Sequence, residues 1–157
     1  MKKMVATLLI LSGENEILLA MKKKRFGKGN WNGVGGKVEP NETIEQAAVR
    51  ETEEEIGVTP IEYEKIGEML FNEQYEGVPE QLTVHIFKCT KWNGEPTESD
   101  EMAPKWFKIN EIPFDQMFAD DRYWIPLFLA GKKFRGQCDF DKDWKITDIK
   151  IVEVDGF

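Results

Sequence analysis

Residues 36–58 read GKVEPNETIEQAAVRETEEEIGV, a glycine turn followed by a segment with seven glutamates between Glu39 and Glu55. Glu51, Glu54 and Glu55 stand at i, i+3 and i+4, which places their side chains on one face of a helix. Acids crowded into a last helical turn repel one another and oppose the helix dipole. Converging carboxylates suit a hard cation, and Mg²⁺ typically adds substrate phosphates and waters to such ligands. The stretch therefore predicts a helix with a metal-binding face.

The same segment has a second, apolar face. Ile44, Ala47, Ala48 and Ile56 recur at helical spacing and can turn toward a core. Gly57 follows the last turn, where a left-handed C-terminal cap is expected. The helix is therefore predicted to be anchored on one side and functional on the other.

The fixed positions of this stretch match a known motif. They are Gly36, Glu42, Arg50, Glu51, Glu54, Glu55, Gly57 and Val58. Together they reproduce the Nudix box, with one departure at Thr52, where the family usually has an apolar residue. Threonine is close to valine in volume, so we expect it to be tolerated. A solvated helix face is the usual explanation for a run of charges, but it does not account for the register of these positions.

The resemblance to Nudix hydrolases extends along the chain. Segments similar to the MutT-type branch, and to its animal members that act on oxidised purine nucleoside triphosphates, are LLAMKK, WNGVGGKV, ESDEM, IPF, DDRYW and KKF. The resemblance implies an α/β/α sandwich around a mixed β-sheet, with residues 1–157 as a single domain and the Nudix box at 36–58. Many predicted strands and few helices likewise favour an α+β fold.

The resemblance also implies a reaction and a cofactor. Water would attack a nucleoside triphosphate to give the monophosphate and pyrophosphate, with Mg²⁺, or Mn²⁺ as a substitute, neutralising phosphate charge. Arg50 would orient the glutamates by charge-assisted hydrogen bonds, and Glu55 would help to activate the water. The implied catalytic residues are Arg50, Glu51, Glu54 and Glu55, and the implied metal ligands are Gly36 through its carbonyl, Glu51, Glu54, Glu55 and Glu101.

Base selection is expected to rest on residues outside the box. The resemblance implies substrate contacts from Thr7, Lys22, Phe26, Asn32, Phe71, Met102, Phe118, Asp120, Asp121 and Trp124. Two neighbouring carboxyls in a dry pocket resist double ionisation, so one can donate a hydrogen bond while the other accepts. Such a pair suits an oxidised purine, as in 8-oxo-dGTP or 2-oxo-dATP. Without the resemblance, an Asp-Asp pair is more often an exposed turn or a helix cap.

The sequence alone leaves two points about this region undecided: the effect of Phe118 and the role of the loop at residues 22–32. Phe118 stands where the animal enzymes have a tryptophan, so an aromatic face is kept while indole area and an N–H donor are lost. Residues 22–32, KKKRFGKGNWN, are predicted in part to be a substrate-facing loop, with lysines toward phosphate and Phe26 toward a base. The alternative for this loop is a solvated flexible connector.

Composition limits the classes of partner. A chain of 157 residues with 41% hydrophobic and 32% charged residues fits one globular domain. The net charge of −8 argues against binding nucleic acid polymers or anionic membranes. Cys89 and Cys138 lack metal-type spacing and are expected to be free thiols in a reducing cytoplasm. We expect a cytoplasmic monomer that binds a small nucleotide.

The remaining elements are predicted from alternation and turn residues. A short apolar run at 4–11 followed by 17–21 indicates a strand–turn–strand unit rather than a signal peptide. Residues 123–129 indicate a short buried helix with Pro126 near its first turn, where proline is tolerated. Further strands are expected at 61–75, 82–88, 105–109, 134–140 and 146–154. His85, the only histidine, is expected to be structural rather than catalytic.

Three functions remain compatible with these residues. The first is hydrolysis of oxidised purine nucleoside triphosphates, which sanitises the nucleotide pool. The second is Nudix hydrolysis of other substrates, such as ordinary dNTPs, dinucleoside polyphosphates or ADP-ribose. The third is a nucleotide-binding module without catalysis, against which the intact box glutamates argue. The base-side residues, not the box, separate the first two.

Overall fold

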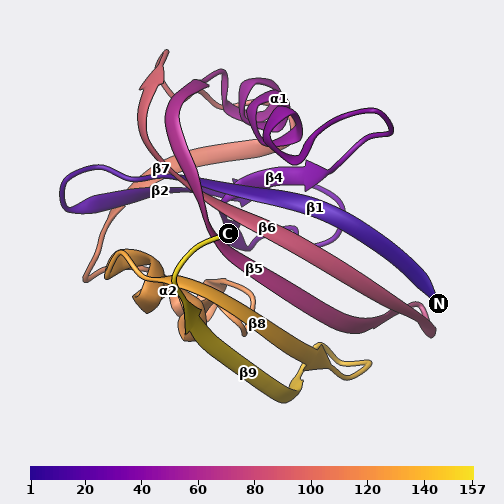
Figure 1. The fold of residues 1–157 in the computed structure, drawn as a ribbon. Helices are drawn as coiled ribbons and strands as arrows, with labels where there is room; N and C mark the ends of the chain where they lie inside the picture. The colour runs from indigo at the N-terminus through magenta and orange to yellow at the C-terminus, as the bar shows by residue number, and fades with distance from the viewer.

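The computed structural model describes all residues from Met1 to Phe157. Figure 1 shows strands layered between two helices, with α1 and α2 on opposite sides. The strands are β1 (Lys2–Leu11), β2 (Glu16–Lys22), β3 (Trp31–Asn32), β4 (Val34–Lys37), β5 (Thr59–Tyr75), β6 (Val78–Asn93), β7 (Met102–Lys108), β8 (Lys133–Phe140) and β9 (Ile146–Val154). The helices are α1 (Ile44–Ile56), a 3₁₀ turn (Phe114–Gln116) and α2 (Asp121–Leu129).

The strands form two sheets. The larger sheet has the order β4-β1-β6-β5-β8-β9, in which β1 pairs with β6 and β5 pairs with β8 in parallel while the other pairs are antiparallel. The smaller sheet, β3-β2-β7, is antiparallel throughout. A mixed sheet with two helices in one small domain confirms the expected α+β fold.

The predicted strand–turn–strand unit at residues 4–11 and 17–21 is wrong in one respect: its two strands, β1 and β2, do not pair with each other along their length. β1 and β2 meet only at an isolated bridge between Ser12 and Ile17, and they belong to different sheets. Consecutive residues are buried at the end of β1 and through the middle of β2, so both strands are covered on both faces. Each is an interior strand that already has a ladder partner on either edge, which leaves no edge for a hairpin.

Helix α1 begins and ends at the residues that the local sequence favours. Thr43 caps the N-terminus in a capping box with Gln46, and Gly57 closes the C-terminus with a φ of 70°, as predicted. Thr52 is fully buried, and its hydroxyl donates to the Ala48 carbonyl over 2.7 Å. The departure from the family pattern at Thr52 therefore leaves no unpaired polar atom in the core.

Helix α2 starts earlier than the sequence indicated. It begins at Asp121, so Pro126 lies in its second turn rather than near the first, and that part of the prediction is wrong. An interior proline removes a hydrogen bond and costs about 3 kcal/mol. Burial of Trp124, Ile125 and Phe128 against the large sheet offsets that cost. Proline is tolerated here because packing, not helix propensity, holds the segment.

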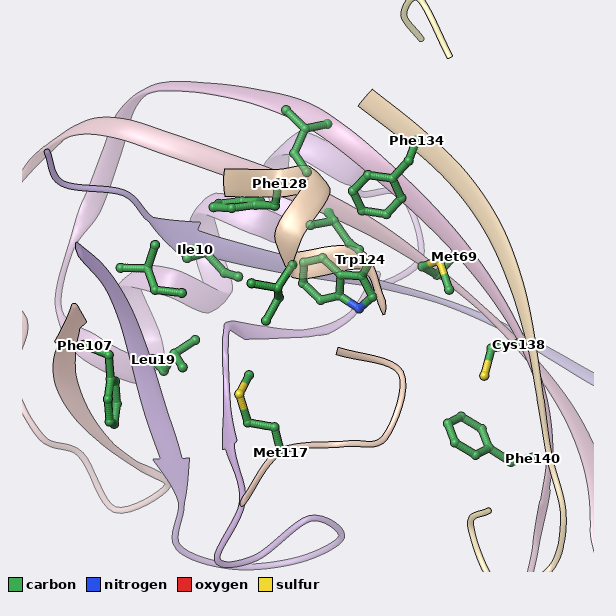
Figure 2. Packing of buried hydrophobic residues seen from close by; sticks show 14 residues of the cluster. Ile10, Leu19, Met69, Phe107, Met117, Trp124, Phe128, Phe134, Cys138 and Phe140 are labelled. Carbon is green, nitrogen blue, oxygen red and sulfur yellow. The ribbon is translucent and has the colours of Figure 1, made fainter. Parts of the chain in front are cut away.

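The larger core cluster lies between α2 and the two sheets. Figure 2 shows Trp124 among Phe128, Phe134 and Met69, and its indole stacks on Phe134 with centroids 5.8 Å apart. A second cluster packs Ala48 and Ile56 of α1 against the opposite side of the strands. The two cores fix α1 and α2 independently, and the candidate site lies between them. No helix is both long and apolar enough to cross a membrane.

Gly67 is required by the close approach of β5 to β8. A Cβ at this position would lie 2.4 Å from the ring of Phe134, which is completely buried. We expect Gly67→Ala to lower the free energy of unfolding by about 1–3 kcal/mol, because the ring has no space to move. Gly156→Ala, where nothing lies within 4 Å, is the control and should change stability little. Equal urea midpoints for the two variants would show instead that the Phe134 ring can shift without cost.

Candidate active site

A cavity of about 550 Å³ opens beside β1 and β5 and is closed at one end by α2. All ten residues predicted to contact substrate line it: Thr7, Lys22, Phe26, Asn32, Phe71, Met102, Phe118, Asp120, Asp121 and Trp124. Gly36 and Glu55 line the same cavity, so it reaches from α2 to the Nudix box. One space therefore connects the base-side residues to part of the proposed catalytic group.

Asp120 and Asp121 lie at the α2 end of this cavity and are only 4% and 3% exposed. The indole Nε1 of Trp124 donates to Asp120 Oδ2 over 2.9 Å. Burial raises the pKa of both carboxyls, and the neighbouring charge of Asp120 raises that of Asp121 further. Of the two, Asp121 has the more strongly raised pKa and so favours the proton, and a pair that shares one proton offers one donor next to one acceptor.

Two buried polar atoms of the cavity have no partner. They are Thr7 Oγ1 and Asp121 Oδ2. Buried polar atoms in proteins are almost always hydrogen-bonded, so these two atoms mark places where a water or a polar ligand group would bind. The third unpaired atom, His85 Nδ1, lies outside the cavity, 3.4 Å from Glu68 Oε1.

His85 has the surroundings of a structural residue. Burial lowers its pKa, and nearby Lys65 lowers it further, so the imidazole stays neutral at physiological pH. It takes no part in lining the cavity that connects Asp120 to Glu55.

Arg50 organises the acidic residues of the box. Its Nε and Nη2 donate to the two oxygens of Glu42 over 2.7 and 3.0 Å. Its Nη1 donates to Glu51 over 2.8 Å and to Glu54 over 3.3 Å. The hydrogen bond from Arg50 lowers the pKa of Glu42 to about 2. Arg50 thus holds three carboxylates in place by charge-assisted hydrogen bonds, without lining the cavity itself.

Glu51 and Glu55 form a close acidic pair next to Gly36. A Cβ on Gly36 would lie 2.6 Å from the Glu51 carboxyl, so only glycine lets that carboxyl rest against β4. Glu55 Oε2 accepts from the Gly35 N–H over 3.3 Å. Burial raises the pKa of Glu55 to about 8, and the charge of Glu51 contributes to the shift. Two repelling carboxyls beside a backbone carbonyl are hard oxygen donors that fit a divalent cation.

The predicted single face of three glutamates is divided in the structure. Glu54 points to solvent with 60% of its side chain exposed, whereas Glu55 turns inward. No group of three acidic side chains is arranged to hold a metal ion. Glu101 is exposed just before β7; its backbone N–H donates to Ser99 Oγ and its carbonyl accepts from the Lys23 N–H. The structure therefore groups Gly36, Glu51 and Glu55, and it links Glu54 to Glu51 through the shared Arg50 Nη1. The role of Glu101 as a ligand stays a prediction.

A family model for the NUDIX domain matches residues 1–128. The chain belongs to the Nudix family. It is 48% identical over 149 residues to the oxidized purine nucleoside triphosphate hydrolase of Danio rerio, covering 95% of this chain and 94% of that protein. The protein of the same name from Mus musculus is 44% identical over 151 residues, with 96% of each chain covered. The MutT protein of Bacillus halodurans has a similar structure, with a TM-score of 0.84, 26% identity, and 94% and 97% coverage.

Several lining residues of this Nudix cavity were not predicted from the sequence. Glu73 shares a face of β5 with Phe71, and the two-residue period of a strand could have placed it there. Arg25 belongs to the 22–32 loop, whose Phe26 also lines the cavity, so part of that loop faces the site. Lys23 instead pairs with Glu98. Trp144 comes from the β8–β9 turn, and no local pattern signals its position.

The Glu73 carboxyl is expected to make the stability of the fold depend on pH. Burial raises its pKa to about 7 from an ordinary 4.5, and Glu80 and Asp120 add to the shift. The folded state therefore binds this proton more tightly than the unfolded state does. Ionised Glu73 lowers the free energy of unfolding by its full amount above about pH 7, and this destabilisation becomes smaller as the pH falls toward 4.5. Glu73→Gln should raise the free energy of unfolding at pH 8 by on the order of 1 kcal/mol, a value discounted for partial exposure.

Urea denaturation at pH 8 and pH 5 measures this effect, and the gain should be much smaller at pH 5. Glu62→Gln, at an exposed position of the same strand, is the control and should change stability little at either pH. An equal gain for Glu73→Gln at both pH values would assign the effect to packing instead of ionisation.

Proposed function

We propose that this Nudix protein hydrolyses oxidised purine nucleoside triphosphates, such as 8-oxo-dGTP and 2-oxo-dATP, to the monophosphate and pyrophosphate. The observation that carries the proposal is the buried Asp120–Asp121 pair, with an unpaired oxygen, at one end of the cavity whose other end contains Glu55. The names of the relatives from Danio rerio and Mus musculus support the same substrate class.

The aspartate pair suits a base edge with a donor beside an acceptor. Protonated Asp121 donates and ionised Asp120 accepts, while the Trp124 N–H fixes the orientation of Asp120. Oxidation of a purine converts ring nitrogens and carbons into N–H and C=O groups, which changes the edge in this way. A site with buried polar groups rejects bases that leave those groups unpaired, and such rejection can reach several orders of magnitude.

The phosphates would lie toward the box. Lys2, Lys22, Arg25 and Lys37 line the cavity and supply positive charge in a protein whose net charge is −8. Gly36, Glu51 and Glu55 would hold Mg²⁺, with Glu54 and Glu101 as further proposed ligands. The cation supplies charge neutralisation and lowers the pKa of a bound water.

Glu55 is proposed to take the proton of the attacking water, in the ionised form that Mg²⁺ bound beside it would favour against the raised pKa of the metal-free carboxyl. Its burial and its Gly35 hydrogen bond fix the carboxyl at the inner end of the cavity. Arg50 positions Glu51 through the 2.8 Å hydrogen bond and does not itself line the cavity. The new P–O bond forms to water oxygen, the bond to the pyrophosphate oxygen breaks, and pyrophosphate leaves.

The proposal extends to the oligomeric state and the compartment of the protein. We propose that residues 1–157 act as one monomeric domain in the cytoplasm on free nucleotides. Cys89 and Cys138 are both buried and unpaired, which suits a reducing compartment.

Pyrophosphate release with Mg²⁺ from 8-oxo-dGTP, 2-oxo-dATP, dGTP, dATP and ADP-ribose tests the proposal. A kcat/KM preference of about a hundredfold or more for an oxidised purine, roughly 2.7 kcal/mol, is expected. Similar rates on dGTP, or a preference for ADP-ribose, would retain Nudix chemistry and reject the proposed substrate. No hydrolysis of any of them would favour a binding module.

Glu55→Gln should lower kcat by two or more orders of magnitude, because the amide cannot take a proton from water. Nucleotide binding should stay within a few-fold of wild type, since the aspartate end of the cavity is unchanged. Single-turnover rates together with binding by calorimetry measure the two quantities. Glu53→Gln, on the exposed side of the same helix, is the matched control. Near-normal turnover of Glu55→Gln would remove this residue from the mechanism.

Asp120→Asn should reduce the preference for oxidised over ordinary purines by roughly 10–100-fold, because a charged acceptor becomes a neutral amide. The Mg²⁺ concentration for half-maximal rate should not change, since Asp120 lies at the far end from Glu55. The kcat/KM ratio of 8-oxo-dGTP to dGTP measures discrimination, with Asp115→Asn as an exposed control. Equal losses on both nucleotides would contradict the assignment of Asp120 to base reading.

A further inference from the structure

Three aromatic rings from distant parts of the chain meet at one side of the base cavity. Phe26 lies on the loop after β2, Phe118 precedes α2, and Trp144 lies in the β8–β9 turn. The Phe26 ring stacks on Phe118 with centroids 5.6 Å apart and an interplanar angle of 25°. It also packs against Trp144, with centroids 4.6 Å apart. We call Phe26, Phe118 and Trp144 the aromatic wall.

The aromatic wall has open space on both sides. A second, outer cavity of about 780 Å³ lies beyond it and is lined by Lys28, Arg122 and Lys145. The three rings are the residues that line both cavities. The wall is packed by its own ring contacts, by Tyr75, whose ring centroid lies 6.0 Å from that of Phe26, and by Phe140, 5.8 Å from Trp144.

The backbone of Trp144 is in a conformation that this residue rarely adopts. Its φ is 61°, in the left-handed region that favours glycine and asparagine, and a bulky residue there costs about 1–2 kcal/mol. Asp141 holds the turn: its Oδ1 accepts from the Asp143 and Lys145 N–H groups over 2.8 and 3.0 Å. Its carbonyl accepts from the Trp144 N–H over 3.1 Å.

A strained residue that persists in an otherwise ordinary turn indicates that its side chain is required. Glycine would satisfy the backbone better, so turn formation does not explain a tryptophan at this position. The side chain is half-buried and directed to the cavity and not to solvent alone. It is also the member of the wall with the largest ring and with an N–H donor.

We propose that Trp144 is a base-binding residue, which packs against the purine and keeps Phe26 and Phe118 in position as the wall of the base pocket. The inference rests on the proposed function, since it requires a purine in this cavity. Aromatic contacts with a base are worth about 1–3 kcal/mol, so loss of the ring should weaken binding roughly tenfold. The chemistry at Glu55 lies at the other end of the cavity and should proceed at its normal rate.

Trp144→Gly relieves the left-handed strain but also removes the packing of the indole against the core. Urea denaturation shows whether the variant stays folded under the assay conditions, and in the folded variant KM for 8-oxo-dGTP should rise about tenfold while kcat stays within twofold. Trp144→Phe should restore KM to within about threefold. Glu76→Gly, which relieves a φ of 51° in the exposed β5–β6 turn and lines neither cavity, is the matched control and should leave KM unchanged.

Binding of 8-oxo-dGMP without Mg²⁺, by calorimetry, tests Trp144 apart from hydrolysis. A tenfold weaker Kd for Trp144→Gly supports the inference even if wild type prefers another triphosphate. An unchanged Kd and KM, or a loss confined to kcat, would each overturn it and leave the proposed function standing. A wild-type protein that neither binds 8-oxo-dGMP nor hydrolyses an oxidised purine triphosphate would overturn both.

Discussion

The bidentate hydrogen bond between Arg50 and Glu42 is the interaction on which the arrangement of the Nudix-box glutamates depends. Seven glutamates within one short stretch would repel one another, and the helix dipole adds to the penalty at the C-terminal turn. Arg50 reduces this repulsion, because its guanidinium donates to Glu42 through two nitrogens and to both Glu51 and Glu54 through the third. Its Nη2 also donates to the Lys37 carbonyl, which ties α1 to the end of β4.

Of the three helix glutamates predicted to bind metal, Glu51, Glu54 and Glu55, only Glu55 has no cationic hydrogen-bond partner. Glu51 accepts a hydrogen bond from Arg50 and lies against Gly36, whereas Glu55 faces the cavity with only a backbone N–H as donor. The most buried member of the group is thus also the one with the most weakly stabilised negative charge. The proposed cation site and the proposed proton acceptor depend on that difference between Glu55 and its neighbours, not on the number of glutamates alone.

The residues that carry local signals were predicted well, and those placed by tertiary packing were not. The cap at Gly57, the closing strands at 134–140 and 146–154, and the residues around the base cavity follow from turn chemistry, periodicity and the Nudix resemblance. The spacing alone places Glu54 and Glu55 100° apart on the helix, but which of the two turns inward depends on how α1 packs against the strands. The partners of β1 and β2, and the position of Trp144, depend on contacts between segments far apart in the chain.

The parallel pairing of β5 with β8 has a consequence for how the protein is made. Every residue of the box, and most of the base cavity, lies N-terminal to Lys133, yet β5 gains its second ladder partner only when β8 is present. During synthesis, which proceeds from the N-terminus, the nascent chain carries all the proposed catalytic residues while one edge of its main sheet is unpaired. The β8–β9 hairpin is made after them, closes that edge and brings Trp144 to the cavity, so the lining of the cavity is complete only once this hairpin has been synthesised.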